Sequence, residues 1–434
     1  MNNVFSLITA LLTASQHLYA EEQFNFPPPE FSKPYAFPDV PTPAPRPEWL
    51  GFADVGVLAA ALALAAYFGL RTRSRRHLVV LTGFAVLYFG FYKKGCVCAV
   101  GAVQNVALAL GPEQYALPLA VGLFFILPLV CALFWGRSFC SSVCPLGAVQ
   151  ELVLLRPLKV PSWLNSALAL LPALYLGLGV LFAAVGSAFI ICRYDPFVQV
   201  FRFGGGTLMV FVGIAVILLS VVVGRPYCRY ACPYGFLLGL LSPFSREKVR
   251  ITTGDCINCH LCAEACPYGA IQPPTPAPQY LPRAAERRRL GLLIALIPVL
   301  MIAGGGLVRL ASPFLARADY RVRLAAQVWQ EEQGKITEPT DETEAFAKRG
   351  VPRTDAYVAA LDVHRRYATG SWFLGGWLGL VLGLRLVSGS VRRHRSIYQI
   401  NQSACVVCGR CYNYCPLDHE RALSLTDAPQ EDQS

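Results

Sequence analysis

Seven apolar stretches constrain the fold of this chain more than any other feature. Each approaches the roughly 20 residues that a helix needs to cross a hydrocarbon core of about 30 Å, at about 1.5 Å per residue. They lie near Leu50–Leu70, His77–Tyr92, Leu117–Trp135, Ala167–Ile191, Thr207–Gly224, Leu290–Val308 and Trp372–Leu386. The sequence therefore predicts an all-α polytopic membrane protein, with about seven transmembrane helices, whose first partner is the lipid bilayer.

The charge distribution predicts how the chain is oriented. Of its residues, 54% are hydrophobic and only 15% are charged, which excludes an ordinary soluble domain and a disordered chain. The net charge of +11 comes from short basic clusters beside the apolar stretches, which is a pattern of membrane topology and not of nucleic-acid binding. These clusters follow the first, fifth and seventh stretches. We therefore expect a bacterial cytoplasmic (inner) membrane protein with a cytoplasmic C-terminus. Lys93 and Lys94 are exceptions to this charge pattern, because they lie at the predicted outer end of the second stretch.

The sequence divides into segments of distinct character. Residues 1–20 resemble a secretory signal peptide without its basic start, and residues 21–49 form a proline-rich arm that lacks the apolar mass for a core. The predicted organisation is then a membrane core at 50–224, a cytoplasmic segment at 225–289, a span at 290–308, an extracytoplasmic insert at 309–371, a span at 372–388 and a cytoplasmic tail at 389–434.

Two complete ferredoxin motifs carry the most specific chemical signal. Both have the form C-x2-C-x2-C-x3-C-P, which is typical of [4Fe-4S] ligation in two-cluster ferredoxins. Their cysteines are Cys256, Cys259, Cys262 and Cys266 in the first motif, and Cys405, Cys408, Cys411 and Cys415 in the second. A zinc site is disfavoured because zinc ligands come in two pairs. Cys256–His260 also matches a haem-attachment pattern, but the cysteines that follow favour iron and sulfur.

The two motifs are expected to share their ligands. In two-cluster ferredoxins the fourth cysteine of each motif ligates the other cluster. We therefore expect Cys415 to complete the first set and Cys266 the second. Both motifs fall on the predicted cytoplasmic face, so they can assemble one small α+β ferredoxin-like module that holds two [4Fe-4S] clusters.

A shorter motif is repeated in the membrane part. The sequence G-R-x-F/Y-C-x3-C-P-x-G occurs at 136–147 and again at 224–235, which indicates a duplicated unit with parallel copies. It supplies Cys140, Cys144, Cys228 and Cys232. These four thiols either bind a further iron–sulfur or other metal centre, or form turns that seat the ferredoxin module.

Three more cysteines lie on the predicted outer side. Cys96, Cys98 and Cys192 either bind a cluster or metal that relays electrons outward, or form a disulfide. Cys131 stands alone in a span and is expected to be an inert core residue. Asp54 and Arg385 lie near span ends, where snorkelling is expected to satisfy them.

The combination of the repeat with two ferredoxin motifs resembles the NapH/NosR group of membrane polyferredoxins over about residues 93–416. The resemblance implies an accessory electron carrier between membrane quinol or a cytoplasmic donor and periplasmic redox partners. A flavin role is not implied, because no flavin-attachment sequence is present. The insert and the seventh stretch also depart from NapH.

The predicted function is that of an integral membrane iron–sulfur electron carrier and not of a stand-alone enzyme. The sequence identifies neither the redox protein partners on the two sides nor a quinone site. One alternative is a redox-dependent assembly or regulatory factor for an exported metalloenzyme. A transporter is a further alternative, which the absence of charged residues within the spans disfavours.

Overall fold

The computed structural model describes residues 47–95, 98–111, 115–204, 206–251, 256–275, 283–336, 339–390 and 395–416. The predicted signal peptide, nearly all of the proline-rich arm, Cys96 and the end of the tail lie outside these described residues. Within them, the secondary structure is almost entirely helical, and a single two-stranded sheet joins two segments that are far apart in sequence.

Four helical segments are long and apolar enough to cross a membrane. They are Glu48–Arg71, Trp163–Ala184, Ala284–Leu310 and Arg353–Ser390. The first consists of α2 (Glu48–Ala66) and the π-helix η2 (Tyr67–Arg71), and the second of α8 (Ser162–Leu168) and α9 (Leu171–Ala184). The third lies within α16 (Arg283–Leu310), and the fourth is α20. A fifth span results if α11, Pro196–Arg202, and α12, Thr207–Ser220, count as one bent span. The chain is therefore a multi-pass membrane protein.

Three of the seven expected spans do not meet this criterion on their own, and one of them, α12, meets it only when it is joined to α11. Helix α5, Leu119–Trp135, has 17 residues, which extend about 26 Å and fall short of a hydrocarbon core of about 30 Å. The stretch predicted near 77–92 is α3, Arg75–Ala85, continued by the π-helix η3, Val86–Tyr92, and the basic residues at its start lower its mean hydropathy. The full number of seven spans therefore stays a prediction.

The remaining elements are short and connect or cap the spans. They are α4 (Ala99–Ala109), α6 (Ser138–Ser142), α7 (Pro145–Leu152), α10 (Ile190–Arg193), α13 (Pro226–Tyr230), α14 (Pro233–Leu241), the 3-10 turn η4 (Ser242–Phe244), α15 (Leu261–Ala265), α17 (Ser312–Ala316), α18 (Tyr320–Glu332), α19 (Asp341–Lys348), α21 (Arg410–Asn413), β1 (Ile271–Gln272) and β2 (Gln399–Ile400). Four of the helices, α7, α11, α13 and α14, begin with proline. Proline suits that first position because its missing N–H needs no partner there.

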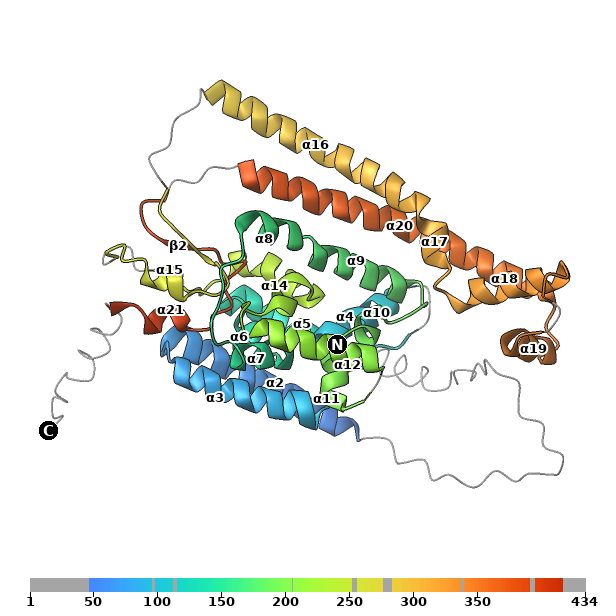
Figure 1. The fold of residues 1–434 in the computed structure, drawn as a ribbon, viewed down its shortest axis with the longest axis horizontal. Helices are drawn as coiled ribbons and strands as arrows, with labels where there is room; N and C mark the ends of the chain where they lie inside the picture. Colours follow the sequence, from blue (N-terminus) through green and yellow to red (C-terminus); the bar gives the residue numbers. More distant parts are fainter. Residues whose placement is uncertain are drawn as a thin grey trace, which may run out of the picture.

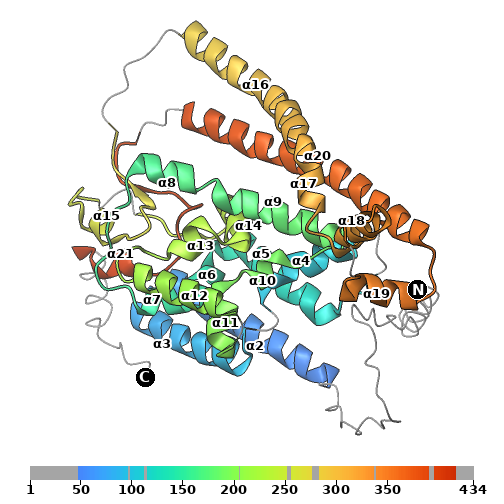
Figure 2. The ribbon, with the colours of Figure 1, turned by 45° about the vertical axis from the view of Figure 1, so that its right-hand side comes forward.

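The helices form a layered bundle with different structures at its two ends. Figure 1 shows α2 and α3 along one edge, α4 to α14 in the middle, and α16 with α20 along the opposite edge. The ferredoxin segments α15, β2 and α21 lie together at one end, while α17 to α19 lie at the other, and the turned view in Figure 2 shows the same separation. The membrane face on which each end lies stays a prediction.

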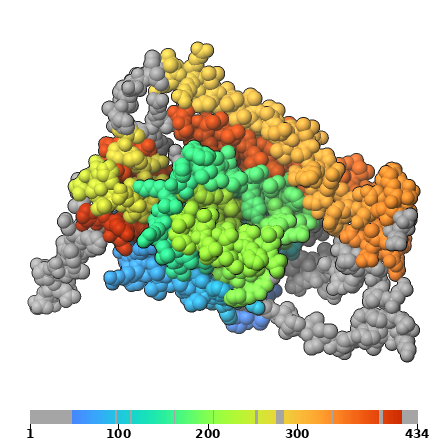
Figure 3. Space-filling view, viewed as in Figure 1, coloured from blue at the N-terminus to red at the C-terminus, as the bar shows by residue number. Residues whose placement is uncertain are grey.

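Helices α16 and α20 pack through their glycines. A β-carbon on Gly375 would overlap the carbonyl oxygen of Gly304, and one on Gly379 would overlap that of Leu300. Small residues at such positions let membrane helices approach closely. Figure 3 shows α16 as an outer layer of the molecule, and its apolar window is only 6% buried within the chain. Most of the apolar surface of this helix is therefore left uncovered by the rest of the described chain.

The predicted insert is built on α20. Helix α20 begins at Arg353, within the predicted insert, and continues without a break through the expected span at 372–386. At 38 residues, α20 is about 57 Å long and exceeds a hydrocarbon core of about 30 Å. Its first turns pack with α17, α18 and the end of α9 around the buried Tyr367 and Val363. The insert is thus a small helical cap with its own apolar core.

The environment of Asp54 differs from the one that the sequence predicts. Its side chain is buried, at 3% exposure, instead of snorkelling to a span end. It forms an ion pair with Lys93 and accepts a hydrogen bond of 2.8 Å from the Tyr88 hydroxyl. Arg385 behaves as expected and donates to the carbonyl oxygens of Ser166 and Ala169 at the end of α8.

Candidate functional site: two ferredoxin motifs and the repeat cysteines

The two ferredoxin motifs come together through the small sheet. Strand β1 follows the first motif and β2 precedes the second, and they pair antiparallel with Ile271 opposite Ile400. Next to this pair, the Asn401 N–H donates to the Ala270 carbonyl oxygen at 2.7 Å. Two segments that are separated in sequence by α16 and α20 therefore form one module.

The two motif loops share the same backbone conformation. Asn258 and His260 have positive φ angles of 54° and 68°, and the corresponding residues Val407 and Gly409 have 54° and 73°. Only glycine adopts this region without cost, and a β-branched residue there is exceptional. The matching angles indicate that the backbone around the cysteines has the same shape in both loops.

The thiols gather in two sets of four. Cys262 interacts electrostatically with the cysteines Cys256, Cys259 and Cys415. Cys411 interacts most strongly with the cysteines Cys408, Cys405 and Cys266. Each set thus contains three cysteines of one motif and the last cysteine of the other.

A small cavity lies at the second set and is lined by Cys266, Cys405, Cys408 and Cys411. Burial raises the pKa of the Cys405 thiol to about 11 and that of Cys408 to about 12. A bare thiolate is therefore disfavoured in this cavity, whereas iron stabilises the thiolate form. The spacing and the donor chemistry fit a four-iron cluster.

His260 links the two motif regions. Its ring Nδ1 is hydrogen-bonded to the Tyr398 hydroxyl, and the two rings meet edge to face at 5.5 Å. Tyr398 directly precedes β2. His260 therefore stabilises the module at the flank of the first motif, as a cluster-flanking residue would.

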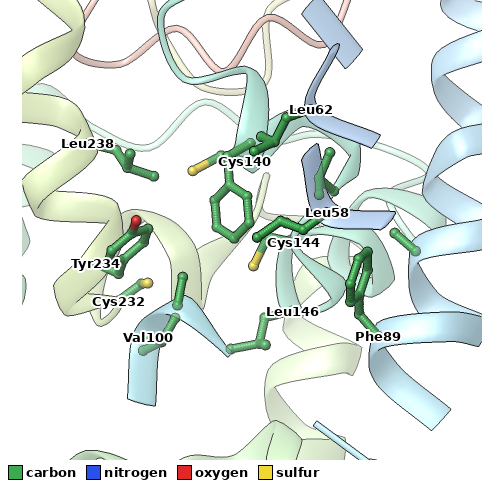
Figure 4. Packing of buried hydrophobic residues seen from close by; sticks show 14 of the residues in the cluster. Leu58, Leu62, Phe89, Val100, Cys140, Cys144, Leu146, Cys232, Tyr234 and Leu238 are labelled. Atoms are coloured by element: carbon green, nitrogen blue, oxygen red, sulfur yellow. The ribbon is translucent and has the colours of Figure 1, made fainter. Parts of the chain in front are cut away.

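Three of the four repeat cysteines are buried in the bundle, and Cys228 is half-buried. Cys140 is in α6, Cys144 precedes α7, Cys228 is in α13 and Cys232 precedes α14. Figure 4 shows three of them among the buried residues of the central cluster, beside Tyr234 and Leu146. The thiols of Cys144 and Cys232 each interact electrostatically with those of Cys140 and Cys228. The structure thus brings all four together.

The arginines and glycines of the repeat make reciprocal contacts. A β-carbon at Gly147 would lie 3.2 Å from Arg225 Nη1, and one at Gly235 would lie 3.3 Å from Arg137 Nη2. Both arginines are buried. Each copy of the motif therefore places its arginine against the glycine of the other copy, and neither glycine can carry a side chain without displacing that arginine.

The turns that open each repeat face the ferredoxin module. A β-carbon at Gly224 would lie 2.9 Å from Pro267 Cβ, and one at Gly136 would lie 3.9 Å from Val407 Cγ2. Arg137 donates to the Ser403 carbonyl oxygen at 2.8 Å. The repeat thus contacts both motifs through its turns, while its cysteines lie on the inner side.

Glu151 connects these parts. It is 6% exposed and forms ion pairs with Arg75 at 3.1 Å, Arg225 at 3.2 Å and Arg410 at 2.9 Å, and it accepts a hydrogen bond from Tyr268. Burial alone would raise its pKa, but the Arg225 and Arg410 guanidinium groups and the Tyr268 hydroxyl lower it from 4.5 to about 2. One carboxylate therefore joins α3, both ferredoxin motifs and the second repeat.

The remaining cysteines behave in different ways. Cys98 interacts electrostatically with Cys192, on α10, whereas Cys96 lies outside the described residues. Cys131 is buried within α5. In the part of the chain that the structure describes, no three histidine, cysteine or acidic side chains meet around a single metal ion. The thiolates that hold a cubic cluster bind at separate corners, so they need not meet around one ion.

Three functional residues escaped the sequence analysis. Glu151 looked like an ordinary helix residue, and its partners come from four different segments. Gln150 donates to Cys228 Sγ at 3.3 Å and accepts from the Tyr227 N–H at 3.1 Å. Asp195 caps α11 and is 2% exposed. The sequence could have singled out Gln150, because the motif C-x2-G-A-V-Q occurs at both 98–104 and 144–150.

Comparisons with known proteins agree with this geometry. A family described as a 4Fe-4S binding domain matches residues 117–162 and again 205–252, which contain the two repeat motifs. A second 4Fe-4S binding domain family matches residues 249–272, the first ferredoxin motif. The chain is thus similar to the NosR/NirI/NapH-like polyferredoxins and carries segments that match 4Fe-4S binding domains.

Several curated proteins are similar over part of their length. The chain is 33% identical to the regulatory protein NosR of Pseudomonas aeruginosa over 53% of this chain and 36% of NosR. It is 30% identical to the protein NirI of Paracoccus denitrificans over 55% of this chain and 39% of NirI. With the putative electron transport protein YccM of Escherichia coli it shares 30% identity over 39% of this chain and 52% of YccM. The chain thus spans about a third to a half of these relatives, and no solved structure matches it significantly.

Proposed function

We propose that this chain is an integral membrane electron carrier that passes electrons between a quinol or cytoplasmic donor and a respiratory or periplasmic redox partner. The observation that carries the proposal is the gathering of the motif thiols into two sets of four, one of them around a cavity. The description of YccM as a putative electron transport protein supports the same function.

Two [4Fe-4S] clusters are assigned to the ferredoxin module. Cys256, Cys259, Cys262 and Cys415 would hold one, and Cys405, Cys408, Cys411 and Cys266 the other. Such clusters supply one-electron transfer without making or breaking a covalent bond to a substrate. The chain itself holds the thiols in place and keeps water from the second set.

A further centre is assigned to Cys140, Cys144, Cys228 and Cys232. Each of the two matches to the 4Fe-4S binding domain family covers one pair of these cysteines. Arg225 interacts electrostatically with both Cys228 of this thiol set and Cys408 of the second ferredoxin set. Its positive charge would raise the reduction potential of anionic clusters on both sides.

The topology completes the proposal. We place the ferredoxin module on the cytoplasmic face and the helical cap on the periplasmic face, with the two repeats as parallel copies across a pseudo-twofold axis. The reciprocal contacts of Arg137 and Arg225 support that symmetry. Electrons would then enter at the module and move toward the repeat cysteines in the bundle.

The test is the iron and acid-labile sulfide content of the anaerobically purified chain, with electron paramagnetic resonance of the reduced form. The two ferredoxin sets alone require about eight irons per chain. An excess that disappears in Cys140→Ser or Cys228→Ser would support the third centre. A chain purified without iron would refute the electron-carrier function.

A regulatory or assembly role is the second candidate, because NosR is named a regulatory protein. The two candidates differ in kinetics. A carrier should be reoxidised rapidly and repeatedly by a soluble quinone analogue or by an added high-potential redox protein. A sensor should bind the same iron but turn over slowly under these conditions.

A further inference from the structure

The two arginines of the repeat have different electrostatic surroundings. Arg225 lies 3.2 Å from the carboxylate of Glu151, which also pairs with two further arginines. Arg137 is the corresponding residue of the first copy, and its guanidinium group contacts the Ser403 carbonyl oxygen and Cys140 Sγ. No carboxylate of the described chain pairs with it. The duplicated unit therefore has an arginine in both copies but a carboxylate partner for only one of them.

A single position accounts for this difference. Glu151 follows the first copy of the motif, and Gly239 occupies the corresponding place after the second copy. A β-carbon at Gly239 would lie 3.8 Å from Arg137 Nη1 and 3.4 Å from the Ser403 carbonyl oxygen. An acidic side chain at this position would face Arg137 as Glu151 faces Arg225, but glycine supplies no charge.

Arg137 is buried without a carboxylate beside it. The residue is 9% exposed, and its Nε has no hydrogen-bond partner within the described chain. A buried charge is costly unless it is paired, and a guanidinium group does not lose its proton in a protein. An anion other than a described carboxylate must therefore counter the charge of Arg137.

The contacts of the guanidinium group indicate where that anion would lie. Arg137 Nη2 donates to Cys140 Sγ at 3.9 Å, and a β-carbon at Gly235 would lie 3.3 Å from the same nitrogen. Arg137 also interacts electrostatically with Cys228. The charge thus lies beside the repeat thiols. A four-iron core with four thiolate ligands has a net negative charge, which increases on reduction.

We propose that Arg137 is the countercharge of the iron–sulfur centre assigned to the repeat cysteines and that, opposite Gly239, it sets the reduction potential of this centre. The inference rests on the proposed function, which supplies the centre, and adds that the two repeat arginines are not equivalent. Arg225 shares a carboxylate, whereas the whole charge of Arg137 acts on the centre. A nearby positive charge stabilises the reduced state more than the oxidised state, because the reduced state is more negative.

Arg137 also reaches the second ferredoxin motif. It donates to the Ser403 carbonyl oxygen at 2.8 Å and interacts electrostatically with Cys405. This contact is with the backbone, two residues before the first cysteine of the motif, whereas the contact with the repeat set is with a sulfur atom. We therefore expect Arg137 to change the potential of the repeat centre more than that of the ferredoxin centre.

The experiment is a redox titration of the anaerobically purified full chain, followed by electron paramagnetic resonance. The signal of the repeat centre is the one that disappears in Cys140→Ser. In Arg137→Gln this signal should titrate at a lower potential than in the wild type, and the ferredoxin signals should shift less. Arg137→Lys keeps the charge and should stay closer to the wild type. Arg71→Gln is the control, because the Arg71 side chain is 69% exposed, and it should leave the repeat signal unshifted.

Gly239→Glu provides a second test in which Arg137 itself is retained. The new carboxylate would face Arg137 and should also lower the potential of the repeat signal. Gly239→Gln is the matched control, since its side chain has nearly the same size but no charge. A loss of stability without a change in potential would show that Arg137 is merely structural.

Three results would overturn this inference alone. They are an unchanged potential in Arg137→Gln, equal shifts in the two Gly239 variants, and a wild-type chain with about eight irons and no signal that depends on Cys140. A ferredoxin signal that shifts more than the repeat signal would also contradict it. The electron-carrier function itself fails only if the wild-type chain holds no iron.

Discussion

Val407 of the second ferredoxin motif packs directly on Gly69 of η2. A β-carbon at Gly69 would lie 2.7 Å from Val407 Cγ1 and 3.3 Å from the Val407 carbonyl oxygen. Val407 is 4% exposed and has a positive φ of 54°, which a β-branched residue keeps only when its surroundings fix it. The membrane helix therefore helps to hold the motif loop in the conformation that positions its cysteines.

Gly69→Val should loosen the ferredoxin module. The new methyl groups would occupy the space of Val407, and such overpacking typically costs about 1–3 kcal/mol. We expect faster proteolysis within 395–416 and lower iron content. Gly56→Val on α2 is the control, because no heavy atom lies within 4 Å of its β-carbon position. Equal proteolysis of the two variants would refute this role for Gly69.

Glu151→Gln should destabilise the chain strongly. Removing one partner from a buried charge network typically costs about 3–5 kcal/mol, because the remaining charges lose their compensation. The measurement is the free energy of unfolding in detergent, followed by tryptophan fluorescence. Glu247→Gln is the matched control, since Glu247 pairs with Arg71 at the surface, where an ion pair contributes under about 1 kcal/mol. Similar losses in both variants would contradict the proposed role of Glu151.

The same network predicts a pH dependence. The pKa of Glu151 is lowered from 4.5 to about 2 in the folded chain. A carboxylate with a lowered pKa stabilises the fold above its unfolded value, and this contribution disappears as the pH falls through the folded value. The difference in stability between wild type and Glu151→Gln should be constant from pH 7 to 5 and shrink below about 4.5. A difference that grows with acidity would contradict the assignment.

Gly375→Leu should separate α16 from α20. The side chain would collide with the Gly304 backbone, which cannot move aside as a flexible side chain can. We expect a lower melting temperature of the purified chain in detergent. Gly376→Leu is the neighbouring control, since its β-carbon position has only one atom nearby, the Met301 carbonyl oxygen at 3.9 Å. If the control is the more harmful of the two, the glycine contact is not what joins these helices.

Cys266→Ser tests the exchange of the last cysteines. If the fourth cysteine serves the other motif, Cys266→Ser should alter the same resonance signal as Cys405→Ser and leave that of Cys256→Ser unchanged. Cys415→Ser should show the reverse pattern. Signals that pair within each motif would instead show that each motif binds its own cluster.

Much of the fold could be read from local sequence. A C-x2-C-x2-C-x3-C-P motif and a run of about 20 apolar residues are both defined within one segment, so neither needs tertiary information. The burial of Asp54 could not be predicted in this way, because Lys93 lies 39 residues away. The continuity of α20 was also missed, since polar residues before Gly370 resemble a loop when the supporting helices α17 and α18 are unknown.

The site was predictable only in part. Cysteine spacing identifies candidate ligands, but Glu151 gains its role from Arg75, Arg225 and Arg410, which come from three other segments. Gln104 and Gln150 were findable, because each follows a C-x2-G motif by three residues. Only the structure shows that their amide groups reach the backbone next to a facing cysteine.

The pairing of β1 with β2 sets an order on the biogenesis of the protein. A ribosome that has finished the first motif must still make α16, the cap and α20 before β2 exists. Until the last span has been inserted, the module lacks a strand and half of its cysteines. A chain that is truncated before β2 therefore lacks both the pairing strand and the four cysteines of the second motif.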